Sequence, residues 1–198
     1  MGGAITPSAL AGRAPASAIR ALGDRRRDAG PPAGAPADHD LRARAERFLL
    51  TEARLLDTRR FEDWLALWRP EGLFWMPLDP ERHDSPAVHQ SLVLDDLRRL
   101  GERVERLRSR AAWSQQPPTR TLRHLGNVEA WDDGDAVEVR SVLTLHAHRD
   151  GMHSLVSGRQ EHRLVPHDGD SSDQLLIEVK VLDLLDADAA HPNLSYLL

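Results

Sequence analysis

The feature that most constrains the fold is a change of hydrophobic period at the centre of the chain. From Asp95 to Trp113, apolar residues recur at alternating spacings of three and four, which predicts an amphipathic helix. Its apolar seam consists of Leu97, Leu100, Val104, Leu107 and Ala111. The pair Pro117-Pro118 then ends helical structure, because proline has no backbone donor and restricts the preceding residue. Residues 119–131 follow as a predicted strand.

Beyond this point apolar and polar residues alternate with a period of two, which is typical of half-buried strands. Three further strands are predicted, near 137–145, 155–165 and 174–184. The side chains expected to face inward from the last strand are Leu175, Ile177, Val179 and Val181. Asp133-Gly134 and Asp150-Gly151 suit the tight turns of hairpins. The C-terminal half therefore predicts a sheet of long antiparallel strands.

Helices are predicted before the centre. Asp38 or Asp40 can cap the first helix. Its apolar stripe, interrupted by one glutamate, consists of Leu41, Ala45, Phe48, Leu49, Glu52, Leu55 and Leu56. A short helix over 61–67, a strand over 71–77 and a loop over 78–91 follow. Helices that precede a run of strands predict an α+β fold, with the helices packed on one face of a strongly curved, mostly antiparallel sheet.

Composition separates a tail from a domain. Residues 1–38 are rich in Ala, Gly, Pro and Arg and poor in large apolar side chains, so we expect a disordered tail. Residues 39–198 suit a single domain. The chain has no cysteine, which excludes disulfides and thiolate ligation of zinc or iron–sulfur clusters by this chain.

The net charge and the hydropathy of the chain argue against nucleic acid and membranes as partners. The net charge is -5 and Lys180 is the single lysine, which argues against nucleic acid as a partner. The sequence has no apolar run of about 18 residues, which a membrane span requires. It shows no secretory signal either, so we expect a cytoplasmic protein.

Four segments together resemble one known family. They are RFLLTEARLLDTRRFEDWLALWRPEGLFWMPLDPE, TRTLRHLGNVEAW, SLVSGRQEHRLV and LDADAAHPNLSYLL, in this order. The order and the motifs resemble the small (beta) subunit of aromatic-ring-hydroxylating dioxygenases. The resemblance implies the cone-shaped, cystatin-like fold shared with nuclear-transport-factor-like proteins. It also implies a non-catalytic structural subunit in aromatic compound catabolism.

The same resemblance implies partners and cofactors. Three copies would form a trimer and join three large alpha subunits in an alpha3beta3 hexamer, which a ferredoxin and a reductase supply with electrons. The Rieske 2Fe-2S cluster and the mononuclear iron would lie on the alpha subunit, and this chain would hold neither. The residues expected at subunit interfaces are Arg120, Arg123, Asn127, Asn193, Leu194 and Tyr196. For the arginines an internal salt-bridge network is the alternative.

An alternative hypothesis is that the chain is an enzyme. Enzymes with a cone of this type place a His and an Asp inside it as general acid and base, and Asp57 and His124 are the candidates for a stand-alone dehydratase or isomerase. The structural alternative is that Asp57 forms a turn and His124 bonds backbone near an interface. A small-molecule-binding module without chemistry is a third possibility.

Histidines on neighbouring strands raise the question of a metal. His146 and His148 are two apart on one predicted strand, so they share a face, and His153 or His162 could add a third ligand. The alternative, which we favour, is that these imidazoles line the polar face of an antiparallel sheet.

Overall fold

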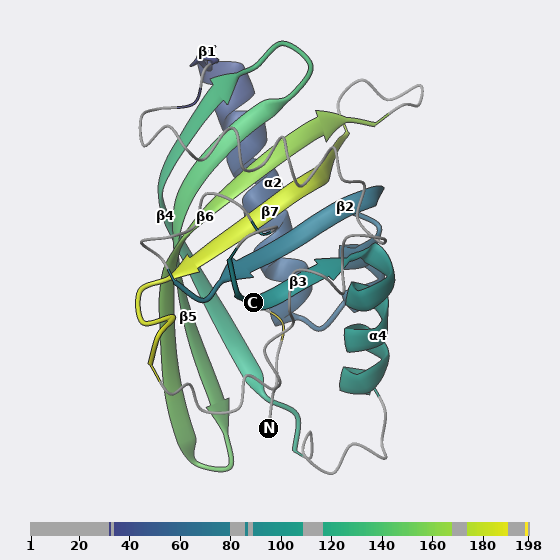
Figure 1. The fold of residues 1–198 in the computed structure, drawn as a ribbon, viewed down its shortest axis with the longest axis vertical. Coiled ribbons are helices and arrows are strands. Elements are labelled where there is room, and N and C mark those ends of the chain that lie inside the picture. Colours follow the sequence, from purple (N-terminus) through teal and green to yellow (C-terminus); the bar gives the residue numbers. More distant parts are fainter. Residues whose placement is uncertain are drawn as a thin grey trace.

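The computed structural model describes residues 32, 34–79, 86, 89–108, 117–167, 174–189 and 197 (Figure 1). In chain order the elements are β1 (Ala35–Pro36), α2 (His39–Asp57), α3 (Phe61–Leu65), β2 (Trp68–Pro77), β3 (Ser91–Asp96), α4 (Leu97–Arg108), β4 (Arg120–Asp132), β5 (Val137–Arg149), β6 (Met152–Pro166) and β7 (Leu175–Leu184). Within the described residues, seven strands form one sheet in the order β1-β4-β5-β6-β7-β2-β3.

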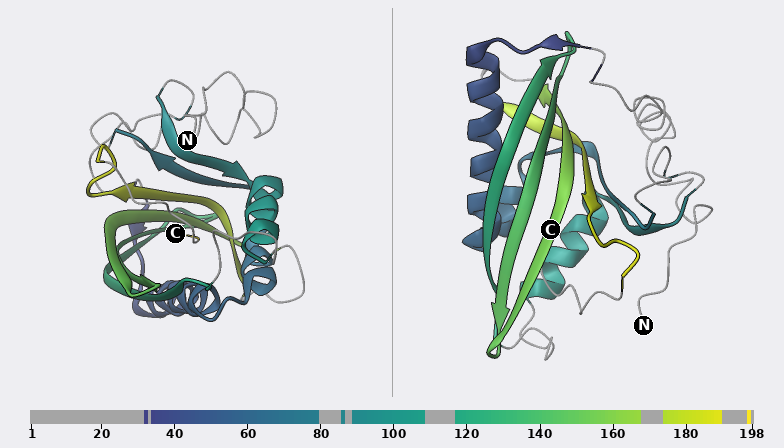
Figure 2. Two further views of the ribbon diagram at one scale, coloured as in Figure 1. Left: turned by 90° about the horizontal axis from the view of Figure 1, so that it is seen from below. Right: turned by 90° about the vertical axis from the view of Figure 1, so that its left-hand side faces the viewer.

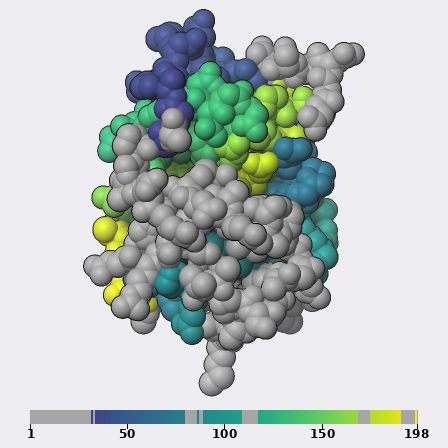
Figure 3. Space-filling view, turned by 45° about the horizontal axis from the view of Figure 1, so that its top comes forward, coloured from purple at the N-terminus to yellow at the C-terminus, as the bar shows by residue number. Residues whose placement is uncertain are grey.

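The sheet is antiparallel except where β2 runs parallel to β7. Long strands β4, β5 and β6 curl strongly, and α2 packs along β4 while α4 packs beside β2 and β3 (Figure 2). In the space-filling view, β1 and the start of α2, in purple, lie against β4, in green (Figure 3). The predicted α+β architecture and the cone expected from the resemblance are confirmed.

Helix α2 begins and packs as its sequence predicts. The backbone N–H of Leu41 donates to the Asp38 carboxylate at 2.8 Å, so Asp38 is the N-cap. The predicted stripe faces the core, where Ala45, Phe48, Leu49, Leu55 and Leu56 are buried. Glu52, the charged residue in this stripe, is also buried.

The predicted inward face of β7 was wrong in part. Leu175 and Ile177 lie in the main core, but Val179 and Val181 lie in a second cluster on the other face with Leu73, Trp75 and Leu94. The cause is a β-bulge: Leu164 pairs with Ile177 and Arg163 with Val179, so Glu178 is an extra residue. One extra residue reverses the side-chain alternation, which turns Lys180, Leu182 and Leu184 inward.

Several predicted boundaries also moved. Strand β3 lies where a loop running into the central helix was predicted, and α4 therefore begins at Leu97, after Asp96 accepts a hydrogen bond from Arg99 N–H at 2.9 Å. Strand β2 begins at Trp68 and α3 ends at Leu65. Ala35 and Pro36, inside the expected tail, pair with β4. Residues 1–31, Ala111 of the predicted seam and Trp113 at the end of the predicted helix lie outside the described residues.

Candidate functional site

A charged cluster occupies the interior of the cone. The Glu52 carboxylate on α2 accepts hydrogen bonds from Lys180 Nζ at 2.8 Å and from Trp64 Nε1 at 3.2 Å, and His162 Nε2 lies 3.0 Å away. Glu52, His162 and Lys180 are 3%, 0% and 2% exposed. Helix α2, helix α3, strand β6 and strand β7 each contribute one of these four side chains. The cluster thus joins the helices to the far strands of the sheet.

Burial and pairing set the charges in this cluster. Burial alone would raise the pKa of Glu52, but the opposing effects of Lys180 and His162 outweigh it and hold that pKa well below its usual range. Burial lowers the pKa of His162 and of Lys180, against the attraction of Glu52. His162 Nδ1 has no hydrogen-bond partner in the described part of the chain. This fits a neutral imidazole whose proton is on Nε2, beside a Glu52–Lys180 ion pair.

The sequence pattern does not predict this cluster, although each of its members is conspicuous. Glu52 interrupts an apolar stripe, Lys180 is the single lysine, and His162 is one of the candidate metal ligands. The bulge at Glu178 is what brings Lys180 to the inner face, opposite His162. A charged residue within an apolar helical stripe was the available signal, because such a residue must find a buried partner.

A second ion pair lies where α2 ends and β4 begins. The Asp57 carboxylate accepts hydrogen bonds from Thr121 Oγ1 and from the Arg123 backbone N–H, both at 2.8 Å, and forms an ion pair with the Arg123 guanidinium. Arg123 Nη2 also donates to the backbone carbonyl of Leu197 at 2.5 Å. The Arg123 side chain is 4% exposed, so it belongs to an internal network.

The structure does not bring Asp57 and His124 together as a pair. His124 is exposed and lies on the opposite side of β4 from Arg123, which contacts Asp57. It pairs across the sheet with Thr144, whose hydroxyl contacts Ser157 at 3.4 Å. Asp57 instead ends α2 and binds the first part of β4.

The other histidines considered as metal ligands, His146, His148 and His153, lie on the outer face of β5 and β6. The rings of His148 and His153 lie 4.5 Å apart, and Arg120 Nη2 is 2.9 Å from His148 Nδ1. His146 is exposed in the next row, whereas His162 faces the interior and cannot join them. Among the described residues, no group of three His, Asp or Glu side chains could hold a metal ion.

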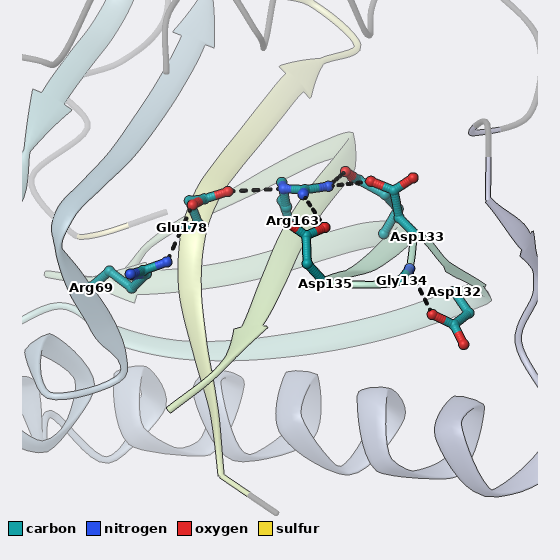
Figure 4. A network of polar contacts seen from close by, with 8 residues as sticks. Arg69, Asp132, Asp133, Gly134, Asp135, Arg163 and Glu178 are labelled. Carbon is teal, nitrogen blue, oxygen red and sulfur yellow. Dashed lines mark hydrogen bonds and ion pairs between the residues drawn. The ribbon is translucent and has the colours of Figure 1, made fainter. Parts of the chain in front are cut away.

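Arg163 joins four carboxylates at one end of the sheet (Figure 4). It donates to Asp133 at 2.6 Å, Glu138 at 2.7 Å, Glu178 at 2.8 Å and Asp135 at 2.9 Å. This network ties the turn between β4 and β5 to β6 and β7. Burial opposes the charge of Arg163, but the hydrogen bonds that it donates to Asp133 and Glu138, together with the charges of Glu138 and Glu178, keep its pKa above the usual range.

The predicted interface residues lie in different environments. Arg120 and Asn127 are exposed on β4, and Asn127 has a positive φ of 50° at the irregularity between Gly126 and Glu129. An open groove of about 710 Å³ lies beside it, lined by Arg42 and Glu46 of α2 and by residues 125–129. Asn193, Leu194 and Tyr196 lie outside the described residues.

Of the helices described, none is both long and apolar enough to span a bilayer.

Comparison with known sequences finds one family. The profile described as "Ring hydroxylating beta subunit" matches residues 51–186. The 2-halobenzoate 1,2-dioxygenase small subunit of Burkholderia cepacia is 41% identical over 41% of this chain and 52% of its own length. The chain thus spans about half the length of this relative. The N,N-dimethyl phenylurea N-demethylase subunit beta of a Sphingobium species is 34% identical over 78% of this chain and 89% of its own length.

Solved structures give the same picture. The beta subunit of the benzoate 1,2-dioxygenase from Burkholderia mallei superposes with a TM-score of 0.62 at 26% identity, covering 77% of this chain and 95% of that one. A naphthalene 1,2-dioxygenase chain superposes with a TM-score of 0.71 at 22% identity, covering 82% of this chain and 88% of that one, which shows the shared fold.

Proposed function

The chain belongs to the family of ring-hydroxylating beta subunits, and from this membership we propose that it is the structural subunit of an aromatic-ring-hydroxylating oxygenase. Its role is to hold large catalytic subunits in place, and it supplies no reacting group. Relatives with beta-subunit names cover most of this chain, which supports the role of a partner-dependent component.

The proposed assembly is an alpha3beta3 hexamer in which three copies of this chain form a trimer. The alpha subunits hold the Rieske 2Fe-2S cluster and the mononuclear iron, and a ferredoxin and a reductase deliver electrons to them. Because electrons pass between neighbouring alpha subunits, fixing their spacing is the contribution of this chain. The complex acts in the cytoplasm on aromatic compounds.

The observation that supports this proposal is that the Asp57 carboxylate is bound by other side chains of the fold. An acid–base pair requires a carboxyl group that can reach a substrate and a histidine beside it. Asp57 is instead engaged by Thr121 and Arg123, and the His124 side chain lies on the outer face. These positions support a structural role for both residues over a dehydratase or isomerase.

For the subunit interface we propose Arg120 and Asn127, which are exposed, together with Asn193, Leu194 and Tyr196. Arg123 fits the alternative of an internal network, since its guanidinium contacts Asp57 and the Leu197 carbonyl. Its effect on assembly would be indirect, through the position of β4.

Turnover measurements test the proposal. The isolated chain should transform no aromatic substrate. The complex with its large subunit should oxidise substrate at an unchanged rate when His124, His146 or His148 is replaced by Ala. Turnover by the isolated, metal-free chain that is lost in His124→Ala would establish the enzyme reading instead.

A further inference from the structure

Three rows of side chains cross the outer face of β4, β5 and β6 near the turn between β5 and β6, and we call them the histidine face. The pairing register sets each row, which takes one residue from each strand. The rows are Arg120, His148 and His153, then Leu122, His146 and Leu155, then His124, Thr144 and Ser157. None of these side chains is a carboxylate. This part of the sheet therefore presents apolar, neutral polar and basic groups together.

Two leucines at the middle of the histidine face are open to solvent. Leu122 is 66% exposed and Leu155 is 58% exposed, and both lie beside the exposed His146. Because the sheet curls, its outer face is convex, whereas small-molecule sites are concave (Figure 2). Exposed apolar side chains within a polar rim are typical of a surface that contacts another protein. The histidine face is therefore suited to a protein partner.

The charge of the histidine face indicates which partner fits it. Arg120 Nη2 lies 2.9 Å from His148 Nδ1, and the rings of His148 and His153 lie 4.5 Å apart. Arginine is always charged, and histidine is the side chain that gains a charge between pH 8 and pH 5. Among the described residues, the other charged side chains that border the face are Arg149 and Asp150 at the turn, and Arg159 and Asp183 in the next row. These four have opposite charges in equal number, so a partner with carboxylates fits the face best.

The turn between β4 and β5 presents the complementary charge. Residues 132–135, which we call the acidic turn, contain Asp132, Asp133 and Asp135, and the Asp135 side chain is 82% exposed. Arg163 contacts Asp133 at 2.6 Å and Asp135 at 2.9 Å, but one guanidinium cannot neutralise three carboxylates (Figure 4). Strand β5 separates the acidic turn from the histidine face, which lies toward its opposite end (Figure 1). One copy of the chain therefore cannot bring the two surfaces together.

Symmetry limits how copies of the chain can use the histidine face. Two copies that paired through this face alone would place Arg120 and the histidines against one another. A contact between two different surfaces avoids this repulsion, and it can repeat around a closed ring. We propose that the histidine face of one copy binds the acidic turn of the next copy, and that three such contacts form the trimer. This inference rests on the proposed function, and it adds which surfaces meet and how pH controls their contact.

Analytical ultracentrifugation of the full chain, without the large subunit, tests the contact. The unchanged chain should form trimers whose apparent affinity is at least about fivefold weaker at pH 8 than at pH 6, because histidines gain charge while aspartates keep theirs. Leu155→Glu should weaken the trimer at least about tenfold, because it places a carboxylate opposite the acidic turn. Leu50→Glu is the matched control, since Leu50 lies on α2 with a similar exposure of 54%, and it should leave the trimer unchanged.

A charge swap identifies the acidic turn as the partner surface. Arg120→Glu and Asp135→Lys should each weaken the trimer at least about tenfold, and the chain with both changes should recover to within about threefold of the unchanged chain. Both side chains are exposed, so the variants should fold. The proposal is overturned by a single-chain mass of the unchanged chain at the highest concentration measured, by equal affinity at the two pH values, or by a double variant without recovery. An intact Leu155→Glu trimer would also overturn it.

The large subunit separates this inference from the proposed function. If Leu155→Glu leaves the trimer intact but prevents binding of the co-expressed large subunit, the histidine face belongs to that subunit. The inference is then wrong, while the proposed function stands. If neither the unchanged chain nor any variant binds the large subunit, the proposed function fails, and the trimer measurements still decide whether copies meet through the histidine face and the acidic turn.

Discussion

At the scale of single residues, the buried Glu52, His162 and Lys180 are the least expected feature of this chain. Ion pairs inside a protein add little net stability, because desolvation offsets their attraction. Removing one member is different, since it leaves the others charged or unpaired in an apolar interior. The cluster therefore makes the fold depend on each of its members, and on Glu52 above all, because Glu52 contacts both others.

Glu52→Gln should lower the free energy of unfolding by about 3–5 kcal/mol, because the Lys180 ammonium then lacks its buried counter-charge. Urea unfolding measures this loss. Glu102→Gln is the control, since Glu102 forms an exposed pair with Arg98 and its loss should change stability by about 0.5 kcal/mol or less. Similar small losses in both variants would contradict the buried ion pair.

The pKa of His162 gives a prediction about pH. Burial lowers this pKa in the folded chain, while the unfolded chain keeps a pKa near 6.5, so the unfolded state binds more protons below that pH. The free energy of unfolding should therefore fall as pH drops from 7 to 5, by up to about 1.4 kcal/mol per pH unit from this residue. The lowered pKa of Glu52 affects the free energy of unfolding in a separate pH range, below the usual pKa of 4.5.

His162→Gln should flatten that pH dependence, since glutamine does not titrate. Urea unfolding of both chains at several pH values between 5 and 7 gives the comparison. The exposed His124 and His146 are common to both chains and cancel in the difference. Parallel pH curves for the two chains would show that His162 does not become protonated on unfolding.

At the scale of elements, local patterns predicted most of what lies in this structure. The buried stripe of α2 and the strands β5 to β7 follow from spacing, and Asp38 is one of the two caps that the sequence predicted. What failed depended on contacts distant in sequence. The bulge at Glu178 arises in pairing with β6, so a strand considered alone gives the wrong face for Val179 and Val181. The buried cluster was missed for the same reason.

Two glycines test the packing of neighbouring elements. A Cβ at Gly158 would clash with the Asp183 carbonyl on β7 and lie 3.1 Å from Leu182 Cδ1, so Gly158→Ala should destabilise by about 1–3 kcal/mol. A Cβ at Gly101, in α4, would meet nothing within 4 Å. Gly101→Ala should therefore stabilise by up to about 1 kcal/mol. Thermal unfolding compares them, and a stabilising Gly158→Ala would refute the close approach of β6 and β7.

The Arg163 network makes a prediction about the turn between β4 and β5. Arg163→Gln should lower stability by about 2 kcal/mol, because Asp133, Asp135 and Glu138 then lose their shared donor. Hydrogen exchange should accelerate at residues 133–136, where the turn is held. Arg60→Gln, in an exposed pair with Asp63, is the control and should leave that turn unchanged. Unaltered exchange in Arg163→Gln would show that the turn does not depend on Arg163.

At the scale of the whole molecule, the interior of the cone is filled by side chains that stabilise the fold. Ion pairs, core side chains and Leu197 occupy its interior, and the outer face of β4 to β6 exposes Leu122 and Leu155 beside the histidines. The family could be inferred from ordered motifs in the sequence, and its profile covers residues 51–186. Local pattern could not reveal the internal pairing of Arg123, because Asp57 lies 66 residues away in the chain.

Native mass spectrometry of the chain co-expressed with the large subunit of its own source organism shows whether the two subunits associate. We expect one complex that contains three copies of each subunit. Asn127→Trp, which adds bulk to an exposed proposed contact, should reduce the amount of that complex while the isolated chain stays folded. A chain that never associates with the large subunit, although both are folded and abundant, would contradict the account.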